Sequence, residues 1–245
     1  MEYEIDVIIT KGYLLDMLKV LESVVDDAVF VFTEAGLMCR CVDPAHVMMA
    51  QYSIDTEAFE NYEVPKTSRF AITLEKLHNI LKISDSECRI RYDGGHKIVF
   101  ISGAITKKIG VLALDDIKPP KPPEITFSNS FNIKNDKLLV VVKGSDGISD
   151  NIKIGVSKTY VKFISAGDVD NVQFEYLKDG VIGELEFKEH TKANYSLEYF
   201  KKVVGCTGKN TIFKVDHGDL KPISFSFYDS ERLAHAKIMI APRED

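Results

Sequence analysis

A glycine-containing stretch at residues 205–211, Gly-Cys-Thr-Gly-Lys-Asn-Thr, comes nearest in composition to a phosphate-binding loop. Such a loop needs four residues between its glycines and a serine or threonine directly after the lysine, because backbone amides and that hydroxyl hold the phosphates and their Mg²⁺. Only two residues separate Gly205 from Gly208, and Asn210 follows Lys209. The stretch is better explained as the end of a helix, where glycine accepts the left-handed backbone of a cap.

Candidate metal ligands and nucleophiles are scattered. Cys39 and Cys41 are one residue apart, and no second cysteine pair at zinc spacing follows. On a strand these thiols share a face, so packing inside a sheet explains them better. Asp43, His46 and a serine could form a triad, but no nucleophile elbow accompanies them. We therefore expect no catalytic residue, no cofactor and no metal ion, and an undetected enzyme is kept as an alternative.

The charge distribution restricts how the chain could meet nucleic acid. With 31 basic and 37 acidic residues among 245, the net charge is −6, which argues against a protein that holds DNA by bulk positive charge. The predicted helices carry seven lysines against six acidic residues, a net charge of +1, while the rest of the chain carries −7. This segregation fits helices that face a phosphate backbone, but a solvated helix face explains the count at least as well.

Composition indicates a soluble globular protein. Apolar residues make up 45% of the chain, and no run approaches the ~18 apolar residues of a membrane span. Four cysteines are too few and too dispersed for a disulfide framework, so we expect reduced thiols and a cytoplasmic protein.

Hydrophobic periodicity predicts an α+β chain with antiparallel sheets. Helices are expected at residues 12–25, 74–83, 135–147 and 196–204. Residues 182–187 are expected to match the region before the helix at 74–83. Strands are expected at residues 3–9, 28–32, 37–42, 46–54, 69–73, 88–92, 97–102, 105–114, 125–133, 151–156, 160–166, 172–177, 211–216, 222–228 and 234–240.

The helix at 135–147 is predicted against local propensity. Residues 138–142, Leu-Leu-Val-Val-Val, are rich in β-branched side chains that favour a strand. The internal repeat of the chain requires a helix in this place, and tertiary context often overrides propensity differences of ~0.5 kcal/mol per residue.

The chain divides near its middle and repeats. Four of its eight prolines lie between residues 119 and 123, and proline cannot donate to a helix or a sheet interior. Elements recur at an offset near 123 residues, and each half divides again, which gives four copies of a strand–helix–three-strand unit. We therefore predict a domain at 1–114, a connector at 115–125 and a similar domain at 126–245, each with two helices.

The chain resembles the sliding clamps of archaea and eukaryotes, the proliferating cell nuclear antigen (PCNA) family. The resemblance rests on the order of the elements, the internal repeat and the central proline-rich connector taken together. The resemblance covers residues 1–245. It is sharpest at residues 41–47 (Cys-Val-Asp-Pro-Ala-His-Val), at residues 195–200 (Tyr-Ser-Leu-Glu-Tyr-Phe) and at residues 240–243 (Ile-Ala-Pro-Arg).

The resemblance implies the DNA clamp fold and a closed ring of three subunits with helices lining the hole. In the family, the last strand of the first domain pairs with a strand of the neighbour's second domain. The implied interface residues here are Lys108, Ile109, Gly110, Val111, Leu112, Ala113, Val172, Gln173, Phe174, Glu175 and Tyr176.

The resemblance also implies lysines that face encircled DNA without reading its sequence. Lys82 and Lys143 match basic positions of the family's inner helices. Leu15, Asp16 and Glu22 stand where relatives often carry lysines, and Gly205 replaces another basic position, so the sequence leaves the strength of direct DNA contact open. The plausible neighbours of the two matching lysines are Lys11, Lys19, Lys137, Lys201 and Lys209.

A second implied surface is a pocket for a short peptide motif of partner enzymes. Packing in the core would also explain Val47 and Met49, and an ordinary turn would explain His46. Family partners are DNA polymerases, flap endonucleases, DNA ligases and the clamp loader. The residues carried over are Val42, His46, Val47, Met49, Ile117, Ile125, Pro222, Met239, Ala241 and Pro242.

The function expected from the resemblance is that of a DNA sliding clamp, a processivity factor and docking platform in replication and repair. One alternative is a subunit that works only in a heterotrimer as a partner-specific scaffold with little DNA contact. The implied location is the cytoplasm, at the nucleoid, if the source is archaeal, and the nucleus if it is eukaryotic.

Overall fold

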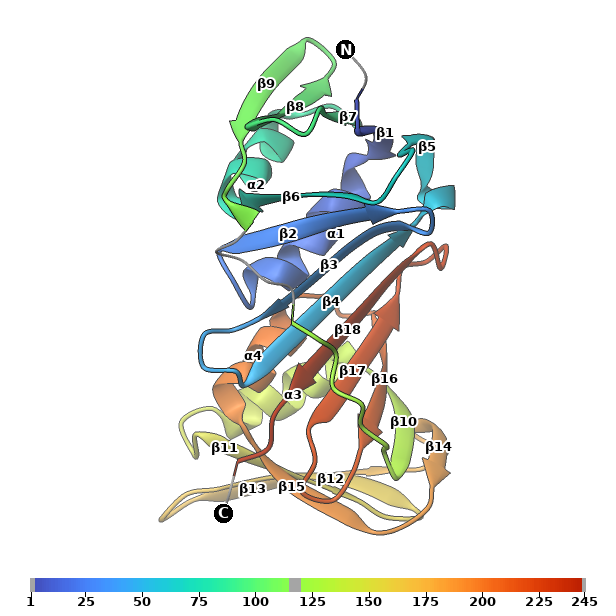
Figure 1. Ribbon diagram of the computed structural model, residues 1–245. Helices are drawn as coiled ribbons and strands as arrows, with labels where there is room; N and C mark the ends of the chain where they lie inside the picture. Colours follow the sequence, from blue (N-terminus) through green and yellow to red (C-terminus); the bar gives the residue numbers. More distant parts are fainter. Residues whose placement is uncertain (1–2, 115–119, 244–245) are drawn as a thin grey trace. The chain divides into compact units, whose positions relative to one another are not determined.

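The computed structural model of the protein describes residues 3–114 and 120–243 (Figure 1). The chain forms two compact units. The first comprises Met1–Pro44, Ala50–Lys121 and Tyr228–Ala236, and the second comprises Ala45–Met49, Pro122–Phe227 and Lys237–Asp245. The domain boundaries expected from the sequence, 1–114 and 126–245 around a connector, stay a prediction.

The first unit combines two helices with antiparallel strands. Its helices are α1 (Lys11–Glu22) and α2 (Leu74–Ile83), which pack side by side. Five strands of this unit form a sheet in the order β5-β1-β7-β8-β9. The other four strands of the unit are neighbours in the order β4-β3-β2-β6. The strands are β1 (Ile5–Thr10), β2 (Asp27–Thr33), β3 (Gly36–Val42), β4 (Met48–Asp55), β5 (Phe59–Glu63), β6 (Ser68–Thr73), β7 (Glu87–Tyr92), β8 (Lys97–Ser102) and β9 (Ile105–Gly110), with a 3₁₀ turn, η1 (Thr56–Ala58), before β5.

The second unit repeats this arrangement. Its helices are α3 (Asn135–Ser145) and α4 (Leu197–Gly205), again side by side. One sheet has the order β13-β12-β11-β15, and the remaining strands are neighbours in the order β14-β10-β16-β17-β18. The strands are β10 (Asn129–Lys134), β11 (Asn151–Val156), β12 (Tyr160–Ala166), β13 (Asn171–Leu177), β14 (Gly183–Phe187), β15 (Thr191–Ser196), β16 (Ile212–His217), β17 (Ile223–Tyr228) and β18 (Ala234–Ile240).

The fourfold strand–helix–three-strand repeat is confirmed. Each of α1, α2, α3 and α4 follows one strand and precedes three. Two strands were not predicted: β5, and β15, which leads into α4. The segment expected to lead into α4, residues 182–187, is β14, the counterpart of β5, and pairs with β10 instead.

Helix α3 is confirmed despite its β-branched sequence. Its buried residues Leu138, Val141 and Ser145 recur at helical spacing, and α3 packs against β10, β12 and β13. At Gly144 a Cβ atom would lie 2.5 Å from Phe174 Cζ of β13, so glycine permits this close approach. Burial against the sheet therefore outweighs local propensity here.

Each unit has its own aromatic core. In the first, Phe30 stacks on Phe70 with ring centroids 5.4 Å apart. In the second, Phe200 meets Phe163 at 6.3 Å and Phe225 at 5.6 Å, edge to face. None of the described helices is long and apolar enough to cross a membrane.

The proline-rich connector has no regular structure where it is described. Residues 120–127 form neither helix nor strand, as the missing amide hydrogens of proline require. Arg40 of β3 donates from Nη1 to the carbonyl of Pro120 over 3.2 Å, which attaches the start of this segment to the first unit.

Candidate functional site

Strand β9 ends its sheet and leaves one row of backbone groups unpaired. The amide of Val111 donates to the carbonyl of His96, and hydrogen-bonded and non-hydrogen-bonded pairs alternate in an antiparallel ladder. Ile109 therefore bonds inward to Ile98, whereas Lys108 lies in a non-hydrogen-bonded pair with Val99. The amides and carbonyls of Thr106, Lys108 and Gly110 consequently point away from β8, along the free edge.

Strand β13 is the corresponding free edge in the second unit. The amide of Lys178 donates to the carbonyl of Thr159, which fixes the alternation along the β12–β13 ladder. The residues that direct their backbone groups outward are therefore Asn171, Gln173, Glu175 and Leu177. β9 and β13 can thus each offer a row of backbone groups to a further strand, and the other edge strands of the described sheets are β5, β6, β14 and β15.

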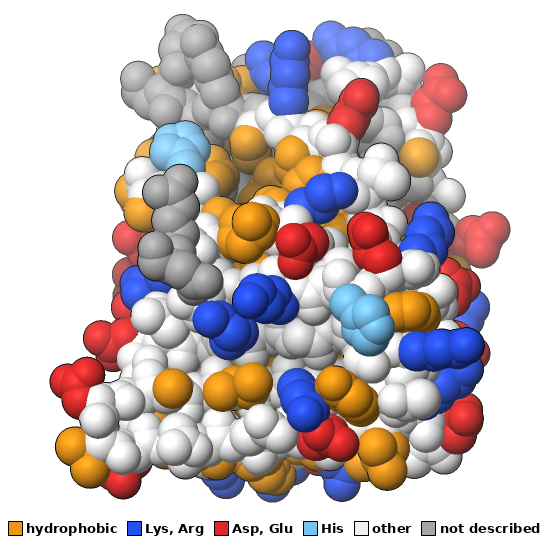
Figure 2. Space-filling model, turned by 90° about the horizontal axis from the view of Figure 1, so that it is seen from below, with side chains coloured by type: hydrophobic (Ala, Val, Ile, Leu, Met, Phe, Trp, Pro, Cys, Tyr) orange, Lys and Arg blue, Asp and Glu red, His pale blue; other side chains and the backbone are white. Residues whose placement is uncertain are grey.

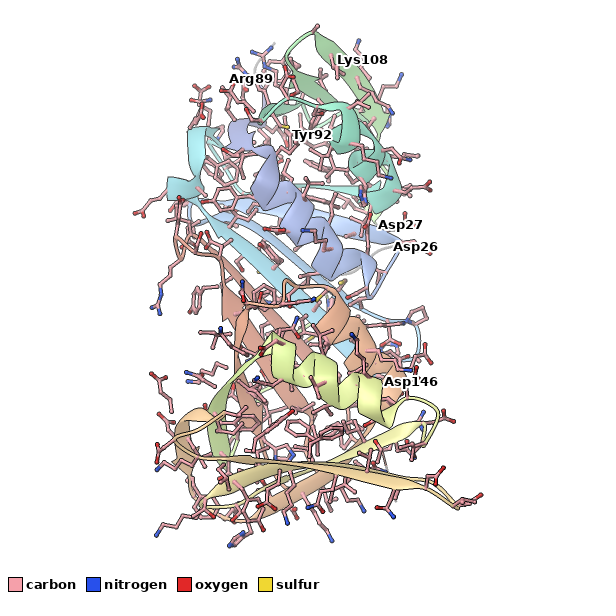
Figure 3. The ribbon with its side chains drawn as sticks, turned by 180° about the vertical axis from the view of Figure 1, so that it is seen from behind. Asp26, Asp27, Arg89, Tyr92, Lys108 and Asp146 are labelled. Atoms are coloured by element: carbon pink, nitrogen blue, oxygen red, sulfur yellow. The ribbon has the colours of Figure 1, made fainter. Side chains whose placement is uncertain are left out.

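Exposed lysines lie on the β9 edge and exposed aspartates lie beside the β13 edge. Lys107 and Lys108 are exposed on β9, and Figure 3 shows Lys108 on this strand. The turn before β13 carries the exposed Asp168 and Asp170, and Glu175 of β13 bonds Lys162 over 2.9 Å. Opposite charges on two different edges favour pairing between different edges of neighbouring copies.

The interface segment expected at residues 108–113 is a strand only in part. β9 ends at Gly110. Beyond it, Leu112 forms a bridge with Ala71 of β6, its amide 2.8 Å from the Ala71 carbonyl. The chain turns from β8 to β6, so Val111, Leu112 and Ala113 do not continue the free edge, whereas all of residues 172–176 lie within β13.

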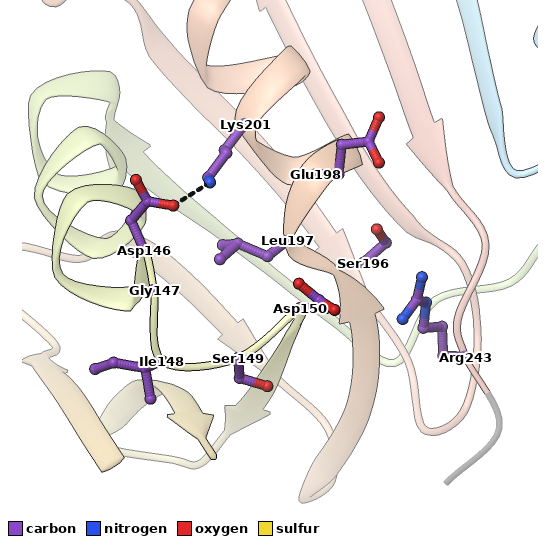
Figure 4. A pocket seen from close by; sticks show the side chains of 10 residues that line it. All are labelled: Asp146, Gly147, Ile148, Ser149, Asp150, Ser196, Leu197, Glu198, Lys201 and Arg243. Carbon is purple, nitrogen blue, oxygen red and sulfur yellow. Dashed lines mark hydrogen bonds and ion pairs between the residues drawn. The ribbon is translucent and has the colours of Figure 1, made fainter. Parts of the chain in front are cut away.

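Three of the seven lysines expected to face DNA have acidic partners. Lys19 pairs with Asp16 over 2.8 Å, and Lys137 lies 3.6 Å from Asp136. Lys201 pairs with Asp146 at the end of α3, and its hydrogen bond lowers the pKa of that carboxyl (Figure 4). Because these lysines are partly neutralised by neighbouring carboxylates, the positive potential of the helix face stays low.

Lys11 is used inside the fold. Its Nζ donates to the carbonyl of Ser84 over 2.5 Å, just past the end of α2. Asn135, at the same place in α3, is fully buried and donates from Nδ2 to the carbonyl of Val204 over 3.0 Å, at the end of α4. In each unit the first residue of one helix therefore bonds carbonyls at the end of the other helix, which helix geometry leaves unpaired.

Three predicted lysines remain available on the surface. Lys82 bonds only Asn79, over 3.3 Å. Lys143 and Lys209 are exposed, and within the described ranges their ammonium groups have no ion pair or hydrogen bond. Among the lysines predicted to face DNA, these three are the ones that the fold leaves for a polyanion.

The predicted phosphate-loop look-alike is a structural junction. Gly205 and Gly208 do not have the left-handed backbone that we expected, since neither has positive φ. Asn135 Nδ2 bonds Thr207 Oγ1 over 3.0 Å and the carbonyl of Gly208 over 3.2 Å. Carbonyls converge on a side-chain donor here, whereas a phosphate would need amides.

The cysteines are buried thiols, as the alternation on β3 predicted. Cys39 and Cys41 are both buried, and burial raises the pKa of Cys41 to about 12 and that of Cys39 well above its ordinary value. A protonated, buried thiol is a poor nucleophile and ligand. Within residues 3–114 and 120–243, no group of three His, Cys, Asp or Glu side chains is placed to hold a metal ion.

The residues expected to form the peptide pocket are only partly brought together. Within the second unit, the amide of Ala241 donates to the carbonyl of Val47 over 2.8 Å, so the 45–49 turn and the end of β18 are adjacent. Lys221 Nζ bonds the carbonyl of Thr126 over 2.8 Å, which places Pro222 near Ile125. Ile117 lies outside the described residues, and Val42 belongs to the first unit.

Exposure separates these pocket residues. Met239 is 5% exposed and packs in the core. His46 is exposed and has φ 56°, a turn conformation. The half-buried members, whose side chains remain available to a ligand, are Val42, Val47, Met49, Ile125, Pro222, Ala241 and Pro242.

A polar hollow of about 560 Å³ lies between the loop after α3 and the start of α4 (Figure 4). Its cations are already engaged: Lys201 bonds Asp146, and Arg243 bonds Asn151 Oδ1 over 2.7 Å. Its hydroxyls, from Ser149 and Ser196, have no histidine beside them in the lining, so the hollow lacks the serine–histidine pair of a serine hydrolase.

Comparisons with known proteins agree with this architecture. A profile of the proliferating cell nuclear antigen N-terminal domain matches residues 6–101. A DNA polymerase sliding clamp of Thermoplasma acidophilum is 27% identical over 234 residues, which cover 94% of this chain and 95% of the relative. One of Methanocella arvoryzae is 25% identical, with 93% and 94% covered.

Solved structures show the same fold. A. fulgidus PCNA bound to the C-terminal region of FEN-1 superposes with a TM-score of 0.90 at 22% identity, over 98% of this chain and 99% of that one. PCNA from Thermococcus kodakaraensis gives a TM-score of 0.88 at 18% identity, over 98% and 100%. The repeated units, the family profile over residues 6–101 and the full-length relatives lead to one conclusion: the chain is similar along its length to the DNA sliding clamps of the proliferating cell nuclear antigen family.

Proposed function

We propose that three copies of the chain close into a ring that encircles duplex DNA and acts as a processivity factor. The observation that carries the proposal is the pair of unpaired edges, β9 in the first unit and β13 in the second, with opposite charges. A joint between two different surfaces of identical copies is head-to-tail, and it closes into a ring when the rotation per copy fits. Pairing also covers edges that would otherwise promote aggregation.

The helix face supports retention by encirclement. A clamp that gripped phosphates tightly would slide slowly, and each phosphate contact adds salt dependence. Lys19, Lys137 and Lys201 are partly neutralised, which leaves Lys82, Lys143 and Lys209 as the main contacts to DNA. Three such sets in a ring would steady the duplex without reading its sequence.

The half-buried residues around Val47 and Ala241 support a docking site for a peptide motif of partner enzymes. Apolar side chains beside an accessible backbone suit short motifs with aliphatic and aromatic anchors. The similar A. fulgidus protein was solved with the C-terminal region of FEN-1. We propose flap endonuclease, DNA polymerase, DNA ligase and the clamp loader as partners, and we infer no catalytic activity for the chain itself.

The solution mass tests the ring. One chain has a mass of 27.5 kDa, so a trimer has three times that value, 82.5 kDa. Light scattering on the purified chain should give the trimer mass. Once loaded, the ring should stay on a closed DNA circle and leave the same DNA after linearisation, because only a topological link depends on free ends. Equal retention on both forms would contradict encirclement.

The low charge of α1 favours one second candidate, a subunit that forms rings only with related chains. The α1 cation Lys19 is paired, and Glu22 lies 2.8 Å from His78. A purified chain that stays a monomer or dimer, and forms a trimer after related chains are added, would support this candidate. Since the relatives compared above are archaeal clamps, we propose that the chain works in the cytoplasm at the nucleoid.

A further inference from the structure

A second hollow, of about 420 Å³, lies on the outer face of the sheet formed by β13, β12, β11 and β15. Figure 2 looks onto the molecule from the side of these strands and shows lysine and arginine side chains interspersed with hydrophobic ones. Gly155 of β11 is one of the residues that line the hollow. Its neighbours across the ladders are Lys162 on β12 and Lys192 on β15.

The fold gives no reason for a glycine at position 155. Its φ is outside the left-handed region, and a Cβ atom there would meet nothing nearer than the carbonyl oxygen of Thr191 at 3.9 Å. Glycine in a strand interior weakens the strand, and it often marks a place where a ligand or another backbone approaches closely. The missing side chain creates a notch in the row of outward-facing residues.

The notch has an apolar floor and a basic rim. Tyr160 and Ile164 contribute apolar surface, and Lys162 Nζ lies 4.6 Å from the centroid of the Tyr160 ring. Lys153, Lys162, Lys192 and His190 line the hollow, against the single carboxylate of Asp219. Lys192 is exposed, and its ammonium has no partner within the described part of the chain.

We propose that this notch, hereafter the Gly155 groove, docks an acidic segment of a partner protein through one apolar anchor side chain. Lys162 and Lys192 flank Gly155 on the two adjacent strands, so they stand about 10 Å apart, twice the strand spacing. In an extended peptide alternate side chains share a side, so carboxylates at positions i and i+4 stand about 13 Å apart with the anchor at i+2 between them, and the flexible lysine side chains cover the difference. Acidic groups on both sides of an apolar side chain therefore match the groove.

A peptide fits better than a nucleic acid. A phosphate backbone needs a continuous row of cations, whereas the apolar surface of Tyr160 and Ile164 separates the lysines here and Asp219 lies beside Lys192. A peptide carboxylate at Lys162 shares that cation with the exposed Glu175. The groove lies wholly within the second unit and shares no residue with the free edges or the predicted peptide pocket. The inference therefore stands independently of ring formation.

Binding of labelled acidic heptapeptides to the full-length chain, followed by fluorescence anisotropy, tests the proposal. Three peptides share their aspartates and glutamates and differ in the central residue, which is leucine, phenylalanine or glycine. We expect leucine or phenylalanine to bind at least about tenfold more tightly than glycine, the effect of burying part of one apolar side chain. A single-stranded oligothymidine is the competing probe.

Four variants separate the groove from general effects. Gly155→Val fills the notch with a residue that suits a strand and Lys192→Glu reverses a rim charge, so each should weaken binding at least tenfold. The matched controls are Gly183→Val, at an exposed glycine of β14, and Lys214→Glu, on β16; both should bind as the unmodified chain does. The Gly155→Val protein should form the same oligomer by light scattering and have the same melting temperature as the parent.

Two outcomes would overturn the proposal. The first is equal peptide affinity in Gly155→Val and the parent, or no binding of any of the three peptides. The second is tighter binding of the oligothymidine, lost in Gly155→Val, because this would assign the groove to a nucleic acid.

Discussion

Proline at position 108 tests the β9 joint directly. Lys108 directs its amide away from β8, so a proline there removes a donor from the free edge and keeps every β8–β9 hydrogen bond. The proline ring also occupies space that a neighbouring strand needs. The chain should therefore keep its fold and lose its ability to associate.

The expected magnitude follows from the number of joints. One lost backbone hydrogen bond costs about 1 kcal/mol, and crowding by the ring raises the cost of each joint to at least about 1.4 kcal/mol, or tenfold in its equilibrium constant. A closed trimer has three joints, so its association constant should fall at least about a thousandfold. Sedimentation over a dilution series should show the Lys108→Pro protein dissociating at concentrations where the parent is a trimer.

Two further variants make this result interpretable. Lys108→Ala removes the charge and keeps the amide, so it should weaken the trimer less than proline does. Ile109→Pro breaks an internal β8–β9 bond and should lower the melting temperature of the subunit itself. A Lys108→Pro protein that stays trimeric to the same dilution as the parent would refute the assignment of β9 as a joint.

Three other predictions concern the pocket and the buried polar groups. Val47→Glu places a charge on the half-buried turn and should abolish binding of a peptide motif while light scattering still reports a trimer; unchanged affinity would remove Val47 from the pocket. His217 is fully buried, and burial lowers its pKa to about 4, so the unfolded state, with a pKa near 6.5, binds the proton more tightly. The free energy of unfolding should be highest above pH 6.5 and fall by about 3 kcal/mol as the pH drops towards 4. In urea unfolding, the His217→Leu protein should lack this pH-dependent loss. If the unfolding free energies of parent and variant fell in parallel with pH, the prediction would be wrong. Asn135→Ala leaves the carbonyls of Val204 and Gly208 without their donor and should cost about 2 kcal/mol of unfolding free energy, with a smaller loss at the exposed Asn210→Ala.

The elements were predictable where periodicity is strong. Helix α2 was predicted with both of its ends, because Leu74, Leu77, Ile80 and Leu81 lie on one buried face. Helix α3 required the internal repeat, since its β-branched residues alone favour a strand. Strand β5 escaped prediction because its residues are mostly half-exposed and show no clear alternation.

The candidate site was less accessible to sequence reasoning. Lys11 was expected to face DNA. Because α2 packs beside α1, Lys11 instead donates a hydrogen bond to the carbonyl of Ser84, just past the end of α2. The notch at Gly155 was missed because a lone glycine in a strand gives no signal until its open surroundings are known. The spacing of Lys162, Gly155 and Lys192 across three strands exists only after the strands have paired.

The sequence by itself determined the repeat, the resemblance to a family and the residues of most helices, since periodicity and order are local properties of the chain. Only the tertiary structure decided which of two adjacent residues, Lys108 or Ile109, offers its amide to a neighbour, and that Lys201 of α4 pairs with Asp146 at the end of α3. The physical reason is that hydrogen-bond direction and charge pairing depend on strand register and helix packing, which bring together residues far apart in the sequence.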